Sequence, residues 1–205
     1  MIAFSIIYGS IAGMTAPQLT IVTSTDWHDY ELLDSGNLKK LERFGEFRFI
    51  RPEPQAMWQP RLDADAWVAD GMFRPDKNET DSSDSGGWQL SKNLPASWQM
   101  RYQDLRFLAR PTPFRHLGFF PEQAAHWNWC AEKIQHFQQK HDRRPRILNL
   151  FAYSGLASLH AAAAGAEVTH VDASKKAIAQ AFENRDVCGL QDAPIRFITD
   201  HASGF

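Results

Sequence analysis

The chain has 205 residues, of which 43% are hydrophobic, and it carries a formal net charge of −2 at neutral pH. This length and apolar content are enough to bury a core, so we expect a soluble cytoplasmic protein of one and a half to two domains. The slightly negative charge argues against a strongly basic nucleic-acid-binding domain. The eight histidines and two cysteines show no metal-site spacing, and we expect neither a metal nor a membrane as partner.

Residues 1–28 are predicted to be a poorly ordered N-terminal extension. Residues 1–13 are apolar, but they lack the basic start of a signal peptide and are too short to span a bilayer. Met14 begins a polar stretch that is more typical of a true N-terminus. We therefore expect no packed role for the residues before it.

Residues 29–114 are predicted to form a small β-rich domain, because short β-like runs alternate there with turns. The expected strands are 30–33, 40–44, 47–51, 88–91 and a longer one over 98–109. Residues 75–87 are too polar to pack, so we expect a mobile loop. For the tryptophans of this region we favour core packing over base stacking. They are Trp58, Trp67, Trp88 and Trp98.

Residues 115–205 are predicted to form a second domain that begins with a helix after Phe120. Apolar residues recur at helical spacing from Trp127 to Phe137 and give one stripe to lie against a sheet. A later helix is predicted from Ser174, which can cap it, to residue 187 or 188, with Gly189 as its left-handed stop. Cys130 and Cys188 fall in these helices and are interpreted as buried thiols.

Residues 146–172 predict a strand over 147–151, a glycine turn, an alanine-rich helix and a second strand that ends in an acid. Gly155 lets the chain turn sharply into a helix whose free backbone N–H groups face a ligand. Asp172 ends the second strand at the same sheet edge, where a carboxylate can accept both hydroxyl hydrogens of a ribose. The pattern therefore predicts a site for an adenosine-containing cofactor.

The glycine content of this turn bears on which cofactor binds. A dinucleotide site needs a Gly-x-Gly-x-x-Gly pattern so that a pyrophosphate can approach the backbone. This turn has one glycine, bulky neighbours and the nearby hydroxyl of Ser154. S-adenosylmethionine has no phosphate and presents a small amino-acid end, so we favour it over a dinucleotide. A βαβ core that binds no ligand remains as a less favoured alternative, because the fold alone does not determine function.

Residues 116–123, 149–158 and 171–176 read His-Leu-Gly-Phe-Phe-Pro-Glu-Gln, Asn-Leu-Phe-Ala-Tyr-Ser-Gly-Leu-Ala-Ser and Val-Asp-Ala-Ser-Lys-Lys. In this order they resemble motifs of the class I S-adenosylmethionine-dependent methyltransferases related to the 23S ribosomal RNA cytosine-C5 methyltransferases. The resemblance runs from about Asp29 to the last residue. It implies an α/β fold in which a small β-rich N-terminal domain precedes the first half of a Rossmann-like, doubly wound sheet.

The resemblance also implies roles for individual residues. In that family the glycine turn, here Ser154 and Gly155, holds the methionine end of the cofactor. The acid after the second strand, Asp172, holds the ribose, and the acid after the third, Asp200, contacts the adenine. The segment that closes over the methionine portion points to Gln123. The full set of candidate cofactor-binding residues is His116, Phe119, Gln123, Asn149, Phe151, Tyr153, Ser154, Gly155, Ser158, Asp172, Ala173, Ser174, Asp200 and His201.

The sequence departs from the family in one respect. The Asp-Pro-Pro-like motif that lies beside the target base occurs nowhere in this chain, and the three strands predicted after Pro145 make about half of such a sheet. We therefore expect a chain truncated at its C-terminal end, inactive alone, with catalytic residues beyond Phe205 and an open sheet edge that can self-associate. The predicted function is S-adenosylmethionine-dependent methylation of RNA, with ribosomal RNA as partner. A non-catalytic RNA-binding module and an NAD(P)-binding oxidoreductase fragment stay as alternatives.

Overall fold

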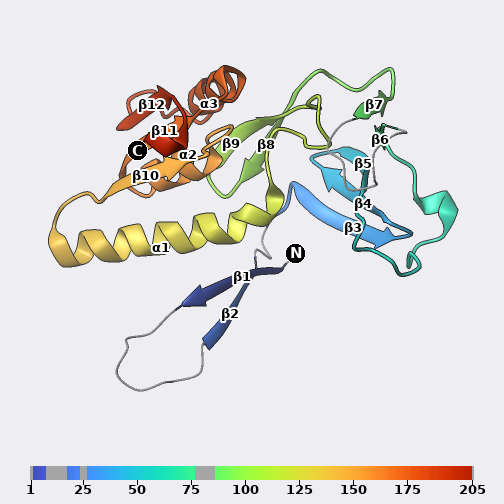
Figure 1. The fold of residues 1–205 in the computed structure, drawn as a ribbon, viewed down its shortest axis with the longest axis horizontal. Helices are drawn as coiled ribbons and strands as arrows, with labels where there is room; N and C mark the ends of the chain where they lie inside the picture. Colours follow the sequence, from blue (N-terminus) through green and yellow to red (C-terminus); the bar gives the residue numbers. More distant parts are fainter. Residues whose placement is uncertain (1, 8–17, 24–26, 77–85, 205) are drawn as a thin grey trace.

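A computed structural model describes residues 2–7, 18–23, 27–76 and 86–204. A β-rich part precedes an α/β part, and the long helix α1 (Ala124–His141) leads from one to the other (Figure 1). The α/β fold class predicted from the sequence is confirmed by this element order. Short 3-10 turns lie at η1 (Ala64–Ala66), η2 (Pro121–Gln123) and η3 (Ala202–Gly204).

The segment predicted as an N-terminal extension contains regular structure that the sequence did not predict. Strands β1 (Ile2–Ile7) and β2 (Gln18–Thr23) pair antiparallel. Trp27 is only 7% exposed, and its ring contacts those of Tyr102 and Trp127. The packed part of the chain therefore includes Trp27, which we had placed in the extension. The predicted disorder of residues 8–17 and 24–26 lies outside the described residues.

A five-stranded sheet makes up most of the β-rich part. Its strands, in sheet order, are β3 (Tyr30–Gly36), β4 (Lys39–Phe44), β5 (Phe47–Pro52), β6 (Gly71–Pro75) and β7 (Gly86–Leu90). All neighbours are antiparallel except β5 and β6. Strand β6 was not predicted, and the predicted mobile loop falls largely on residues 77–85, outside the described ones.

The single long strand predicted over residues 98–109 is wrong. The structure has an antiparallel hairpin of β8 (Trp98–Tyr102) and β9 (Leu105–Ala109), with Gln103 in the left-handed region at φ 52°. The turn was missed because it contains neither glycine nor asparagine, the residues that usually adopt positive φ. The hairpin matters for the site because it packs on the α/β part, where Leu108 N–H donates to Asn184 Oδ1 at 2.9 Å.

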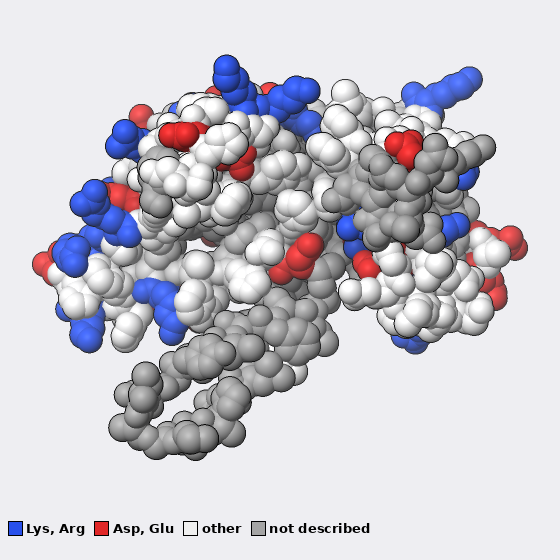
Figure 2. Space-filling view, viewed as in Figure 1, with Lys and Arg blue, Asp and Glu red and all other residues white. Residues whose placement is uncertain are grey.

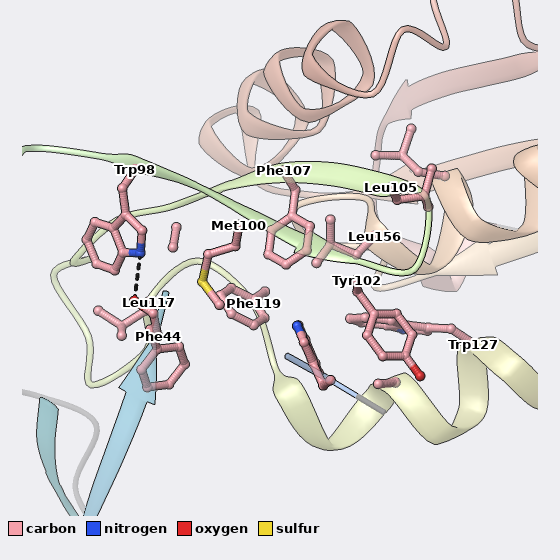
Figure 3. Packing of buried hydrophobic residues seen from close by; sticks show 14 of the residues in the cluster. Phe44, Trp98, Met100, Tyr102, Leu105, Phe107, Leu117, Phe119, Trp127 and Leu156 are labelled. Carbon is pink, nitrogen blue, oxygen red and sulfur yellow. Dashed lines mark hydrogen bonds between the residues drawn. The ribbon is translucent and has the colours of Figure 1, made fainter. Parts of the chain in front are cut away.

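One aromatic core joins the two parts of the chain. Figure 3 shows that this core contains Phe44 from the sheet, Trp98 and Phe107 from the hairpin and Trp127 from α1, with Leu156 between Phe107 and Tyr102. The Trp98 indole N–H donates to the carbonyl of Phe44 at 3.1 Å, drawn as a dashed line. Packing is thus continuous across residue 114, the predicted domain boundary. Trp88 and Trp98 pack as expected, whereas Trp58 is 56% exposed.

The α/β part has three parallel strands in the order β10 (Arg146–Leu150), β11 (Glu167–Asp172) and β12 (Ile195–Thr199). Helix α2 (Leu156–Ala163) connects β10 to β11, and α3 (Lys175–Val187) connects β11 to β12. The predicted first half of a doubly wound sheet is therefore confirmed. The predicted cap is present as well, since Ser174 Oγ accepts from Ala177 N–H at 3.3 Å.

Three further observations concern the described part of the chain. None of its helices is long and apolar enough to cross a membrane. No group of three or more histidine, cysteine, aspartate or glutamate side chains there could hold a metal ion. Cys130 and Cys188 are free thiols, but both are half-buried instead of fully buried as expected.

Candidate functional site

The turn between β10 and α2 has an unusual backbone. Phe151, Tyr153 and Gly155 all have positive φ, at 54°, 48° and 90°. This conformation costs roughly 1–2 kcal/mol for a residue with a side chain, so Phe151 and Tyr153 must be held there by other contacts. One of these ties the turn to the neighbouring strand, since Ala152 N–H donates to the Val171 carbonyl at 3.0 Å.

The Asp172 carboxylate is the second tie. Its Oδ2 accepts from Tyr153 N–H and its Oδ1 accepts from Ser174 N–H, each at 2.8 Å. Asp172 therefore bridges the strained turn and the start of α3 in addition to any contact with a ligand. Because each carboxylate oxygen can accept more than one hydrogen bond, both oxygens keep capacity for further donors.

A cavity of about 350 Å³ lies beside this turn. Three segments line it: the end of the 116–123 motif with the first turns of α1, the β10 turn, and the start of α2. The lining residues are Phe119, Phe120, Gln123, Trp127, Asn149, Leu150, Phe151, Ala152, Tyr153, Ser154, Leu156 and Ala157. Six of the predicted cofactor residues are among them, so two motifs that are well separated in the sequence meet here.

Behind the turn, a series of polar side chains links strands β10 and β11 to helix α2. Asn149 Nδ2 donates to Ser158 Oγ at 2.9 Å, and that hydroxyl pairs with His170 Nδ1 at 3.0 Å. Ser158 is fully buried, so the structure places it as a support of the turn and not in the cavity wall. Gly155 is the residue of the turn that faces these side chains, since a Cβ added to it would lie 3.5 Å from the His170 ring.

His170 was not singled out by the sequence, which offers no signal for a buried polar group in an apolar strand. Its Nε2 is buried and has no hydrogen-bond partner among the described residues. Burial lowers the pKa of His170 to about 4, although the nearby Asp172 carboxylate acts in the opposite direction. His170 is therefore neutral at physiological pH.

The second acid of the predicted site lies next to the first. Asp200 N–H donates to the Asp172 carbonyl at 3.2 Å, so the two carboxylates stand on adjacent strand ends. Asp200 and His201 are exposed, and Asp200 Oδ1 accepts from His201 N–H at 2.7 Å. Ala173 and Ser174 are exposed at the start of α3. These four residues and Asp172 lie at the carboxyl ends of strands β11 and β12, and none of them lines the cavity.

His116 is a predicted cofactor residue that does not line this cavity. It lines a separate cavity of about 320 Å³ together with Lys40, Arg51 and Arg115. A link to the first cavity runs through Phe120, whose ring centroid is 4.5 Å from that of His116 and 5.5 Å from that of Tyr153. Conversely, Phe120 and Trp127 line the first cavity, and we had not assigned either to the cofactor.

Gly155 supports a test of how tightly this turn is packed. Replacement by alanine is expected to lower the free energy of unfolding by about 2–3 kcal/mol. The added Cβ would lie 2.9 Å from Ala181 Cβ, and the residue would have to adopt φ 90°. Gly189→Ala is the matched control, because φ is 70° there and nothing lies within 4 Å of its Cβ. Equal losses in chemical denaturation would show that the Ala181 contact is unimportant.

No protein-family model matches the chain. It is 50% identical over 54 residues to the ribosomal RNA large subunit methyltransferase K/L of Shewanella sp. (strain W3-18-1), a match covering 26% of this chain and 8% of the relative. It is 38% identical over 65 residues to the protein of that name from Pseudoalteromonas translucida, covering 31% and 9%.

Solved structures give longer matches. The SAM-dependent methyltransferase from Agrobacterium tumefaciens is 46% identical, with a TM-score of 0.80, over 89% of this chain and 56% of that one. A protein from Streptococcus mutans, assigned as a SAM-dependent methyltransferase, is 14% identical with a TM-score of 0.61 over 86% of this chain and 47% of that one. The second match shows the fold alone.

These matches confirm the predicted resemblance to S-adenosylmethionine-dependent methyltransferases, including proteins named for ribosomal RNA. They do not favour the oxidoreductase alternative or a purely RNA-binding module. The chain spans about half the length of the Agrobacterium structure and less than a tenth of the curated relatives.

Proposed function

We propose that this chain is the methyl-donor-binding part of an S-adenosylmethionine-dependent methyltransferase that acts on RNA, with ribosomal RNA as the substrate. The observation that carries this proposal is the pairing of an uncharged cavity at the Gly155 turn with two carboxylates on adjacent strand ends. S-adenosylmethionine has two matching parts: a compact amino-acid end for the cavity, and a ribose whose two hydroxyl groups can donate to the carboxylates. The 46% identity to a solved SAM-dependent methyltransferase supports the assignment.

The residues present fit the donor chemically. Asp172 and Asp200 would accept hydrogen bonds from the nucleoside portion, since both carboxylates keep free acceptor capacity. Ser154 and Gln123, together with the free N–H groups at the start of α2, would hold the amino-acid end in the cavity. When bound, the donor supplies an activated methyl group. The contribution of this chain is to position it, an effect that can supply about 7–11 kcal/mol of a reaction barrier.

RNA as substrate is supported by the names of the relatives and by local charge. Lys140, Arg143, Arg144 and Arg146 are exposed around the end of α1. Figure 2 shows basic side chains gathered at that end of the molecule. Such a cluster can contact phosphates even though the net charge of the chain is −2. A cytoplasmic location is part of the proposal because its substrate is ribosomal RNA.

Self-association through the sheet edge is a further part of the proposal. Within the described residues, strands β10 and β12 each have one neighbour, so each leaves one edge unpaired. Leu148 on β10 is also 51% exposed. Unpaired edges next to apolar side chains are surfaces on which strands of another copy can pair.

The experiment that tests donor binding compares two acids. Asp172→Asn and Asp200→Asn are each expected to weaken S-adenosylmethionine binding by about tenfold in calorimetric titration, because each loses a charged acceptor. Asp172→Asn should also lower the unfolding free energy by about 1–2 kcal/mol, since its carboxylate holds Tyr153 N–H and Ser174 N–H. Asp200→Asn should change it less, because among the described residues the exposed Asp200 carboxylate accepts only from the adjacent His201 N–H. No heat with the folded wild-type chain at high ligand concentration would overturn the proposed function.

A further inference from the structure

The lining of the cavity beside the Gly155 turn has an unusual composition. None of its described lining residues is aspartate, glutamate, lysine, arginine or histidine. Five of them are aromatic: Phe119, Phe120, Trp127, Phe151 and Tyr153. An aromatic ring presents a negative face that attracts a cation without the desolvation cost of a paired charge. The cavity is thus suited to a ligand group that is positively charged and weakly hydrated.

The five rings divide into two sets. Phe119 and Trp127 are buried in the core that joins the two parts of the chain, so their place is explained by packing. Phe120 and Tyr153 are half-buried, and their ring centroids lie 5.5 Å apart at an interplanar angle of 49°. Phe151 is 81% exposed. Core packing therefore does not account for these last three rings.

Phe151 is the least expected of the three. An exposed phenylalanine gains little from burial, and at φ 54° its backbone is also in a region that side chains disfavour. Tyr153, two residues on, is in the same region at φ 48° and is fixed by the bond from its N–H to Asp172. Backbone strain maintained at the rim of a cavity points to a role toward a ligand.

We propose that Phe120, Phe151 and Tyr153 select the positively charged sulfonium of the methyl donor over the neutral thioether of the demethylated product. This inference rests on the proposed function and deepens it. The rings attract the donor through cation–π interactions that vanish when the methyl group, and with it the charge, leaves the sulfur. The product is then held less tightly than the donor, which favours exchange of one for the other.

Asp172 must be separated from this effect, because its carboxylate lies beside Tyr153 and also attracts a cation. The test therefore removes rings while Asp172 stays in place. Phe151→Leu and Tyr153→Leu delete one ring each and keep a side chain of similar backbone preference, so the strain at both positions is retained. Tyr153→Phe keeps the ring and is the conservative control. Phe114→Leu removes an exposed phenylalanine that does not line the cavity.

Calorimetric titration of the full chain would use three probes: S-adenosylmethionine, S-adenosylhomocysteine and sinefungin, which carries a protonated amine in place of the sulfonium. The wild type is expected to bind both cations more tightly than S-adenosylhomocysteine. Phe151→Leu and Tyr153→Leu should each reduce this preference by about two- to fivefold, whereas the controls Tyr153→Phe and Phe114→Leu should leave it unchanged.

The outcomes separate this inference from the function on which it rests. If the wild type binds all three probes equally, or if Phe151→Leu and Tyr153→Leu weaken all three alike, the sulfonium selection is overturned while donor binding stands. If the folded wild type binds none of the probes, the proposed function and the inference both fail. Circular dichroism of each variant before titration confirms that a lost preference is not a lost fold.

Discussion

Replacing Arg51 by methionine is expected to lower the free energy of unfolding by about 3–5 kcal/mol, because the buried Glu42 carboxylate loses both hydrogen bonds from the guanidinium, and among the described residues the only cation left to it is the more distant Lys40 Nζ, at 3.8 Å. Arg51 Nε and Nη2 donate to the two oxygens of Glu42, each at 2.7 Å, and both side chains are buried in the five-stranded sheet. Burial opposes ionisation of Glu42, but the guanidinium outweighs it and holds the pKa of the carboxyl below its usual range.

A double variant shows whether the loss comes from the stranded charge. In Glu42→Gln with Arg51→Met, the carboxylate becomes a neutral amide. Its oxygen can still accept the hydrogen bond that Tyr30 Oη donates to Glu42 at 2.9 Å in the wild type. Most of the stability should return, because no unpaired charge is left in the sheet. Urea unfolding followed by tryptophan fluorescence measures both variants. A loss below about 1 kcal/mol in the single variant would mean that water reaches the Glu42 carboxylate and screens it.

The elements that the sequence predicted well depend on short-range signals. The strand, Gly155 turn, helix and Asp172 follow one another directly along the chain, and each has its own local cause in periodicity, φ preference or capping. Strand β6 and the turn at Gln103 have no such signals. Strand β6 forms because a distant strand offers a partner, since it pairs in parallel with β5 across the η1 loop. The Gln103 turn forms because the two strands that it joins, β8 and β9, pair with each other.

The sequence predicted where the candidate site lies, but it did not predict all of the residues that line the cavity or hold the turn. Asp172 was expected to be free for a ribose, yet its oxygens also hold two backbone N–H groups, a role that only the three-dimensional turn reveals. Trp127 was assigned to the apolar stripe of a helix. Its ring packs in the core as expected, but it also lines the cavity. A periodic pattern specifies which face is buried, but not whether a cavity interrupts that face.

Two buried histidines are expected to make the protein sensitive to mild acid. His160 is 7% exposed and His170 is fully buried, and burial lowers the pKa of each from 6.5 to about 4. Between these values the unfolded chain binds protons that the folded chain does not, so stability falls as pH drops from about 6.5 toward 4. Each histidine contributes up to about 3 kcal/mol to this loss, and above pH 6.5 the contribution disappears because both states are neutral.

His160→Phe isolates one of these contributions from the general loss caused by protonation of carboxylates. The His160 ring stacks on Trp127, with centroids 5.0 Å apart and planes at 22°, so phenylalanine can keep the packing without the titratable group. The variant should match the wild type near pH 7.5 and exceed it by up to about 3 kcal/mol near pH 4. Denaturant midpoints measured across this range decide the matter, since parallel curves for the two proteins would mean that His160 takes up its proton without unfolding.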